Sequence, residues 1–258
     1  MKLSTLMYHD VIGPDGVRGG FEGAGAGVYA VSADEFERQM DGIERVLGEP
    51  PLRADAPLPP RGGWLLTFDD GGSSAALAGA ALARRGWAAH FFVVTERVGQ
   101  PGFLDWEGVR RLAAEGHVIG SHSHTHPQRI GSLPPERLRE EWSRSVTALS
   151  EAIDAPVTTA SVPGGYYSDA VGGAAAEVGI ATLFTSQPRR AMEGIEGCAL
   201  VGRFAVRGST PTQTVVSAAA GKVHPWLRQR AGWAARGAAK RIGGRHYERL
   251  RRVLLSRR

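Results

Sequence analysis

Two adjacent carboxylates end an apolar run in residues 65–72, which read LLTFDDGG. The run predicts a buried strand, and parallel α/β folds place their active sites at the carboxyl ends of such strands. Because neighbouring acids repel each other, we expect a cation close to Asp69 and Asp70. Taken alone, the same pattern also suits a solvated acidic turn before a helix N-terminus, where aspartate is favoured.

Three of the eight histidines fall within five residues, at His122, His124 and His126, directly after the apolar run Val118–Ser121. Imidazole is the commonest metal ligand in proteins. His122 and His126 would lie on one side of a helical turn, so that both could reach one ion. Two histidines at this spacing, taken alone, are more often a surface feature or a packed pair in the core. Two such clusters, both at predicted strand ends of one chain, favour a metal site.

The elements that must position these side chains are short apolar runs that alternate with segments of helical periodicity. A helical stripe from Phe36 to Leu47 follows Ser32 and Glu35 in a capping-box pattern, and Asp105 is expected to cap a later helix. Strand and helix in repeated order predict a mainly parallel sheet. About seven such units favour an α/β fold of the TIM-barrel-like (β/α)-barrel type, with an open sheet as the alternative. The predicted strands are Leu3–Met7, Trp64–Phe68, His90–Val94, Val118–Ser121, Val157–Val162, Ala181–Thr185 and Leu200–Arg203.

The composition supports one sizeable globular fold. Hydrophobic residues make up 42% and charged residues 22% of the 258 residues, which provides enough apolar side chain for a large core. The single cysteine, Cys198, excludes an internal disulfide and a multi-cysteine zinc site, so a metal must be held by histidine and carboxylate. The first residues lack the pattern of a secretory signal, and no stretch approaches the roughly 20 apolar residues of a membrane span. We therefore expect a cytoplasmic protein.

Charge divides the chain into an expected catalytic domain at residues 1–221 and a basic tail at residues 222–258. The tail carries twelve lysines or arginines and one acid, Glu248, whereas the part before it is mildly acidic. We expect a helical extension that either lies on anionic lipid at the inner face of the membrane or packs on the barrel. Nucleic-acid binding is not expected, because residues 1–221 are acidic overall and the tail contains no nucleic-acid-recognition motif. The predicted apolar face of this extension consists of Leu227, Ala231, Ala234, Ala238 and Ile242.

The two motifs resemble those of a known family. Residues 67–71 (TFDDG) and 122–126 (HSHTH) are similar to the first two motifs of the NodB-type polysaccharide deacetylases, carbohydrate esterase family four. Residues 103–121 also resemble the helix and strand that lead into the second motif, and the resemblance extends over roughly residues 1–208. It implies an irregular (β/α)-barrel and a metal-dependent hydrolase that removes acetyl groups from N-acetylated sugars.

The resemblance also implies roles for the motif residues. Asp70, His122 and His126 would hold one divalent metal, most simply zinc, with nickel, cobalt or manganese as alternatives, and Asp69 would be the general base. Two neutral nitrogens and one carboxylate leave coordination positions open for water and substrate, as catalytic zinc sites require. His124 is not a ligand in the family, so we expect it to be a loop residue beside the site.

The third motif is only partly present. Residues 161–167 (SVPGGYY) match the proline-containing loop of the family, which implies that the backbone N–H of Tyr166 is the oxyanion donor. The arginine that many members carry at the start of this loop is absent, with Ser161 near its place. Its usual carboxylate partner has no counterpart around residues 182–187. Both halves of that charge pair are therefore expected to be missing, and the network that orients Asp69 must differ.

The histidine that acts as general acid in most members of the family is also absent from its usual position. Most members carry a histidine near the C-terminus of the domain, but residues 200–207 contain none. Residues 7–11 (MYHDV) resemble the N-terminal motif of the poly-N-acetylglucosamine deacetylase branch, in which the motifs are circularly permuted and the acid comes first. This implies that His9 protonates the leaving amine, and Asp10 could pair with its ring. The alternative is a histidine that is simply packed at the end of a strand.

These observations favour a metal-dependent N-deacetylase acting on an amino sugar of a polysaccharide or glycan precursor. Without export, the substrate would be a cytoplasmic or membrane-linked intermediate. One alternative is an amide hydrolase for a small non-sugar substrate with the same metal centre. The other is a barrel that has lost catalysis and serves as a glycan-binding or membrane-associated protein, which the missing arginine and C-terminal histidine would explain.

Overall fold

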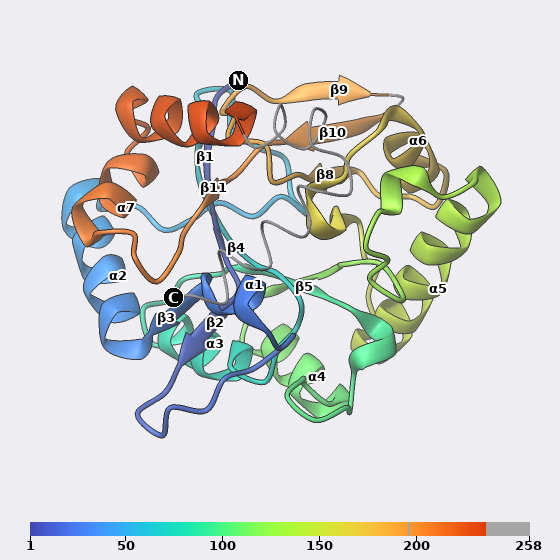
Figure 1. Ribbon diagram of the computed structural model, residues 1–258, viewed down its shortest axis with the longest axis horizontal. Helices are drawn as coiled ribbons and strands as arrows, with labels where there is room; N and C mark the ends of the chain where they lie inside the picture. The colour runs from blue at the N-terminus through green and yellow to red at the C-terminus, as the bar shows by residue number, and fades with distance from the viewer. Residues whose placement is uncertain (196, 236–258) are drawn as a thin grey trace.

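The computed structural model describes residues 1–195 and 197–235. Within them, nine strands form one curled sheet in the order β11-β1-β4-β5-β6-β7-β8-β10-β9 (Figure 1). Neighbouring strands run parallel except β9, which pairs antiparallel with β10. The strands are β1 (Leu3–Tyr8), β4 (Gly63–Phe68), β5 (His90–Val93), β6 (Val118–Ser121), β7 (Thr159–Ser161), β8 (Thr182–Phe184), β9 (Glu193–Ile195), β10 (Cys198–Val201) and β11 (Phe204–Ala205).

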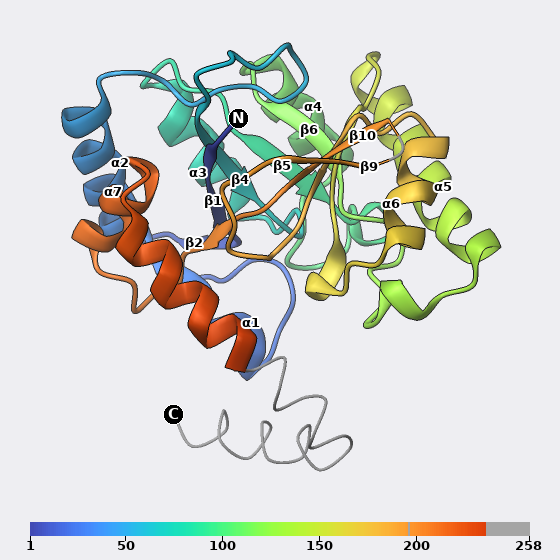
Figure 2. The ribbon, with the colours of Figure 1, turned by 90° about the horizontal axis from the view of Figure 1, so that it is seen from above.

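Helices flank the curled sheet (Figure 2), which gives the expected irregular (β/α)-barrel architecture. The sheet is left open between β11 and β9, its two end strands. A separate small parallel pair, β2 (Asp10–Ile12) and β3 (Ala30–Ser32), lies beyond the end of β1. The α-helices within residues 1–221 are α1 (Ala24–Gly27), α2 (Ala33–Leu47), α3 (Ala75–Ala83), α4 (Trp106–Ala114), α5 (Pro135–Ile153), α6 (Asp169–Glu177) and α7 (Thr212–Ala219).

All seven predicted strands form, with ends that differ from the prediction by at most two residues. The predicted helix starts are also confirmed: Ser32 Oγ accepts a hydrogen bond from the backbone N–H of Glu35, and Asp105 Oδ1 accepts one from that of Gly108. The strands that were not predicted are β2, β3, β9 and β11. Each has two or three residues, too few to show a periodicity.

The predicted tail begins with a helix at residues 223–235 (red in Figure 2) that packs on the sheet. Trp226 is buried against Phe204 of β11, with the ring centroids 5.7 Å apart, whereas Leu227 is 58% exposed. The side-chain amide of Gln229 donates to the carbonyl of Ala205 and accepts from its N–H, both at 2.8 Å. It thereby satisfies both backbone groups on the outer edge of β11.

The predicted continuation of the apolar face to Ala238 and Ile242 lies outside the described residues. The boundary between a domain at 1–221 and a tail at 222–258 stays a prediction. Among the described helices, none is long and apolar enough to cross a lipid bilayer.

Candidate metal centre and active site

The two motifs meet at the carboxyl end of the sheet, as predicted. Asp69 and Asp70 follow β4, and His122 follows β6, two strands away in the sheet. The backbone here is unusual, because Asp70 and His126 have φ values of 77° and 57°. Of the four non-glycine residues with positive φ in the described chain, three lie in these two motifs, the third being Ser123. Such conformations persist only where the surroundings enforce them, and they are concentrated at functional sites.

Asp70, His122 and His126 form a cluster with the donor set of a metal site. One potential ligand atom from each residue lies within 4.8 Å of the others. Asp70 Oδ1 is 3.4 Å from His122 Nε2 and 3.7 Å from His126 Nε2. Two imidazole nitrogens and one carboxylate oxygen suit zinc and related divalent transition metals. The ligand set predicted from the family resemblance is therefore brought together by the fold.

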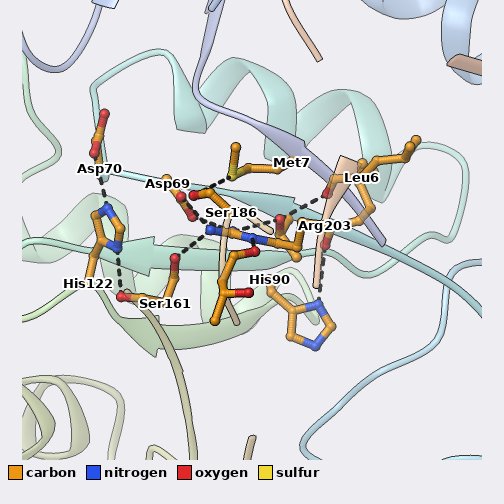
Figure 3. Close-up of polar contacts among 12 residues, drawn as sticks. Leu6, Met7, Asp69, Asp70, His90, His122, Ser161, Ser186 and Arg203 are labelled. Carbon is orange, nitrogen blue, oxygen red and sulfur yellow. Dashed lines mark hydrogen bonds and ion pairs between the residues drawn. The ribbon is translucent and has the colours of Figure 1, made fainter. Parts of the chain in front are cut away.

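A hydrogen bond to the backbone fixes the proton of His122. Its Nδ1 lies 2.9 Å from the carbonyl oxygen of Ser161 (Figure 3). A carbonyl can only accept, so Nδ1 carries a hydrogen. Nε2, which faces Asp70, is the nitrogen that can either donate to that carboxylate or, once deprotonated, bind a metal. This is the arrangement typical of metal-bound histidine, in which the second nitrogen donates to a carbonyl or carboxylate.

The electrostatics of the cluster keep Asp70 ionised and favour a cation beside it, while burial and the charge of His122 lower the pKa of the third residue, His126, to about 4. Burial lowers the pKa of the His122 imidazole, but the carboxylates of Asp69 and Asp70 raise it by more, so that the net shift is upward. Burial likewise raises the pKa of Asp70, and the hydrogen bond from His122 and the nearby imidazoles lower it below its ordinary value. A site that stabilises both an anionic aspartate and a cationic neighbour fits a bound metal cation.

Asp69 is held by a buried arginine. Arg203 Nη1 and Nη2 donate to its two carboxylate oxygens at 2.7 and 2.8 Å, in a bidentate pair (Figure 3). The side chains of Arg203 and Asp69 are 0% and 3% exposed. As expected, residue 161 is no arginine, residues 182–187 hold no carboxylate, and the network that orients Asp69 differs from the family pattern. What was not expected is that an arginine from the connection between β10 and β11 pairs with Asp69 in its place.

The remaining N–H groups of Arg203 are also paired. Nε donates to the carbonyl of Thr185, Nη1 to Thr67 Oγ1, and Nη2 to Ser161 Oγ at 2.7 Å. Ser161, which stands where the family arginine is expected, thus becomes a partner of the relocated arginine. Burial raises the pKa of Asp69, but the charges of Arg203 and His122 and the hydrogen bonds from Arg203 lower it well below its usual range.

Arg203 is a site residue that was not predicted, although it lies inside a predicted strand. The available signal was a lone arginine between Gly202 and Phe204 in an otherwise apolar stretch. A buried charge of this kind needs a partner of opposite sign, so it could have been matched with Asp69, the aspartate that is not a predicted metal ligand. Its distance from Asp69 along the chain, 134 residues, hid the connection.

His9 lies at the same end of the sheet, directly after β1. Its ring stacks on Tyr29 with the centroids 4.4 Å apart, and its Nδ1 is buried without a hydrogen-bond partner among the described residues. His9 and Asp70 line the same small pocket. An orphaned buried nitrogen of this kind is a candidate for contact with a ligand.

Asp10 does not orient His9. Its Oδ1 accepts a hydrogen bond from the N–H of Gly19, and Arg18 lies 3.7 Å from its other oxygen. These contacts anchor the loop after β2 beside the site. In the same loop, the Phe21 ring packs against the ring of His126, with the centroids 4.6 Å apart.

The two remaining predicted residues behave differently. His124 Nδ1 is 2.8 Å from Thr95 Oγ1, outside the ligand cluster, as expected for a loop residue beside the site. The backbone N–H of Tyr166 is directed toward the carbonyl of Pro163 at 3.4 Å. Its assignment as the oxyanion donor stays a prediction.

Comparison with known proteins agrees with the motifs. The profile of the family described as polysaccharide deacetylase matches residues 58–183, which contain β4 to β6 and both motifs. A gellan lyase from Bacillus sp is 34% identical over 105 residues. That match covers 40% of this chain and 4% of the length of the lyase, so the chain spans a small fraction of this curated relative.

Solved structures of similar fold include three bacterial proteins. A polysaccharide deacetylase from Bacillus cereus has a TM-score of 0.71 at 21% identity and aligns over 85% of this chain and 69% of its own. IcaB from Ammonifex degensii has a TM-score of 0.67 at 24% identity, over 84% and 97%. A de-N-acetylase from Aggregatibacter actinomycetemcomitans has a TM-score of 0.69 at 18% identity, over 84% and 100%. At these identities, the similarity concerns the fold.

Proposed function

We propose that this protein, whose residues 58–183 match the profile of the polysaccharide deacetylase family, is a metal-dependent N-deacetylase of N-acetylated amino sugars. The substrate would be part of a polysaccharide or a glycan precursor. The observation that carries the proposal is the convergence of Asp70, His122 and His126 beside an aspartate that a buried arginine holds in place. This combination provides a cation site and a fixed proton acceptor at one point.

Asp70, His122 and His126 would hold the metal, which supplies Lewis-acid polarisation of a carbonyl and a lowered pKa of water at the site. Asp69 accepts a proton from the water whose oxygen bonds to the acetyl carbon. Arg203 fixes both carboxylate oxygens of Asp69 and keeps the group ionised until it takes that proton. The carbon–nitrogen bond of the acetamide then breaks, releasing acetate and the amine.

His9 is proposed as the group that protonates the departing nitrogen. Its place after β1 puts it on the rim that holds Asp69, and its buried Nδ1 has no partner among the described residues. His9→Ala is expected to lower the rate of acetate release by about 10²–10⁴-fold. A variant that releases acetate at nearly the wild-type rate would remove this assignment.

The test of the proposed function is acetate release by zinc-loaded protein from oligomers of N-acetylglucosamine, beside small cyclic amides. Release from the oligomers alone is the expected result. Release from the cyclic amides alone would favour the amide hydrolase. Zinc binding with no turnover on any acetylated sugar would favour a binding protein, although the buried Arg203–Asp69 pair removes one of the two reasons for expecting lost catalysis.

We also propose a peripheral membrane contact of the segment 222–258 on the cytoplasmic side, which would bring the enzyme to lipid-linked glycans. Exposed Leu227, with exposed Arg228 and Arg230 on the helix at 223–235, supports it. The full chain should co-sediment with vesicles that contain phosphatidylserine, and a chain that ends at residue 235 should bind them less. Equal binding of the two would remove the contribution of residues 236–258.

A further inference from the structure

The loop that carries the two histidine ligands has a demanding backbone. It turns between His122 and His126 through two residues in the left-handed region, Ser123 with a φ of 64° and His126 with a φ of 57°. Both residues have a Cβ, and this conformation is disfavoured for them. The direction in which His126 Nε2 points depends on this turn, so the loop needs partners outside itself to remain in this shape.

One carboxylate supplies such partners from another element. Glu141 lies on the buried face of α5 and is 4% exposed. Its Oε2 accepts hydrogen bonds from the backbone N–H groups of His124 at 3.0 Å and Thr125 at 2.8 Å. Its Oε1 accepts a third from Thr125 Oγ1 at 2.6 Å. The carboxylate therefore ties together two consecutive residues at the middle of the turn.

The backbone of the loop is held from a second side. The N–H of Glu96, in the short helical turn after β5, donates to the carbonyl of His124 at 3.0 Å. Glu141 thus fixes the donors of the turn while Glu96 fixes an acceptor. Within the loop, the N–H of His126 donates to Ser123 Oγ at 3.1 Å. Of these contacts, those of Glu141 are the ones made by a buried charged side chain.

We propose that Glu141 is a positioning residue for the metal centre: it holds the loop 122–126 so that His122 and His126 face one ion. This inference rests on the proposed metal site and adds a residue that touches neither metal nor substrate. Side chains that orient metal ligands in this indirect way typically contribute 10–100-fold to metal affinity. The expected signature is weakened metal binding in a folded protein.

The experiment measures the zinc affinity of the full chain by competition with a chromophoric chelator. Glu141→Ala should weaken zinc binding by about 10–100-fold, because the two N–H groups lose their acceptor. Glu141→Gln keeps an acceptor oxygen and should recover most of the affinity, which separates hydrogen bonding from charge. Thr125→Val removes one of the three hydrogen bonds and should give a smaller loss. Glu140→Ala is the matched control, since Glu140 is on the same helix but pairs with exposed Arg137 and Arg144.

Wild-type affinity in folded Glu141→Ala would overturn the proposal, as would an equal loss in Glu140→Ala or a failure of Glu141→Gln to recover affinity. If Glu141→Ala does not fold, Thr125→Val decides, and unchanged affinity in it overturns the proposal. The acetate assay is read separately on the wild type. Zinc binding that depends on Glu141, with no acetate release, would refute the proposed activity and leave this inference standing.

Discussion

The two ends of the sheet both carry buried histidines, and they use them differently. At the amino end, His90 Nδ1 donates to the carbonyl of Leu66, and its Nε2 accepts from the N–H of Ala54. His117 bonds the backbone of Ala89 and Gly79 in the same two-sided way. At the carboxyl end, His122 uses one nitrogen on a carbonyl and presents the other to Asp70. All three rings are buried, so burial does not separate a ligand histidine from a structural one. What separates them is a ring nitrogen that makes no hydrogen bond to the backbone.

Arginine–aspartate pairs show the same contrast. At the amino end, Arg53 and Asp55 pair with side chains that are 43% and 28% exposed. At the carboxyl end, Arg203 and Asp69 pair with side chains that are 0% and 3% exposed. Water screens the first pair, which therefore adds little to stability. The second pair must be complete, because either partner alone would be a buried charge.

Paired histidine variants give the largest expected difference. His122→Ala should reduce bound zinc from about one ion per chain to nearly none, and acetate release with it, because a ligand is lost. His117→Ala should keep its zinc and instead lower the free energy of unfolding by about 1–3 kcal/mol, since two backbone groups lose their partner. Metal analysis after gel filtration and urea unfolding measure the two effects. Zinc loss in both variants would contradict the distinction between His122 as a ligand and His117 as a structural histidine.

Paired aspartate variants test the carboxyl end for catalysis. Asp69→Asn should retain zinc and lower the rate of acetate release by about 10²–10⁴-fold, because the amide cannot accept the proton. Asp55→Asn, at the exposed pair of the amino end, should change the rate by less than about twofold. A fast Asp69→Asn enzyme would show that another group is the base.

An exchange of positions tests the relocated arginine. Arg203→Ser should lower the free energy of unfolding by about 3–5 kcal/mol, because Asp69 is left as a buried unpaired charge. Adding Ser161→Arg to that variant places a guanidinium where the family pattern has it, within reach of the same carboxylate, since Ser161 Oγ is 2.7 Å from Arg203 Nη2. We expect the double variant to regain part of the stability and activity. A double variant worse than Arg203→Ser would mean that the two positions are not equivalent.

The last contrast concerns the acid sensitivity of the amino end. Burial lowers the pKa of His90 from 6.5 to about 4, so the folded state resists a proton that the unfolded chain accepts. The contribution of His90 to the free energy of unfolding is therefore fully present above about pH 6.5. It is lost as the pH drops toward 4, and the loss amounts to at most about 3 kcal/mol. In metal-free protein, His90→Gln should unfold in urea with a weaker dependence on pH over this range. An unchanged dependence would mean that His90 is not the source.

Much of the fold could be predicted because its strands are continuous apolar runs, and the ligand set could be predicted because each motif is local. The two aspartates are adjacent, and the two histidine ligands lie four residues apart. Arg203 and Glu141 could not be assigned in this way. Each contacts a motif from a different element, through pairings that only the curled sheet and the packing of α5 create. Very short strands such as β11 were missed because they carry no period.

The side-chain amide of Gln229 determines how the protein responds to removal of its C-terminal segment. It covers the backbone N–H and carbonyl of Ala205 at the rim of the sheet, beside the buried indole of Trp226. A protease cut at residue 221 would uncover both, and an unprotected rim strand can pair with the same strand of a second molecule. Shortened forms of the protein should therefore self-associate before they lose their zinc.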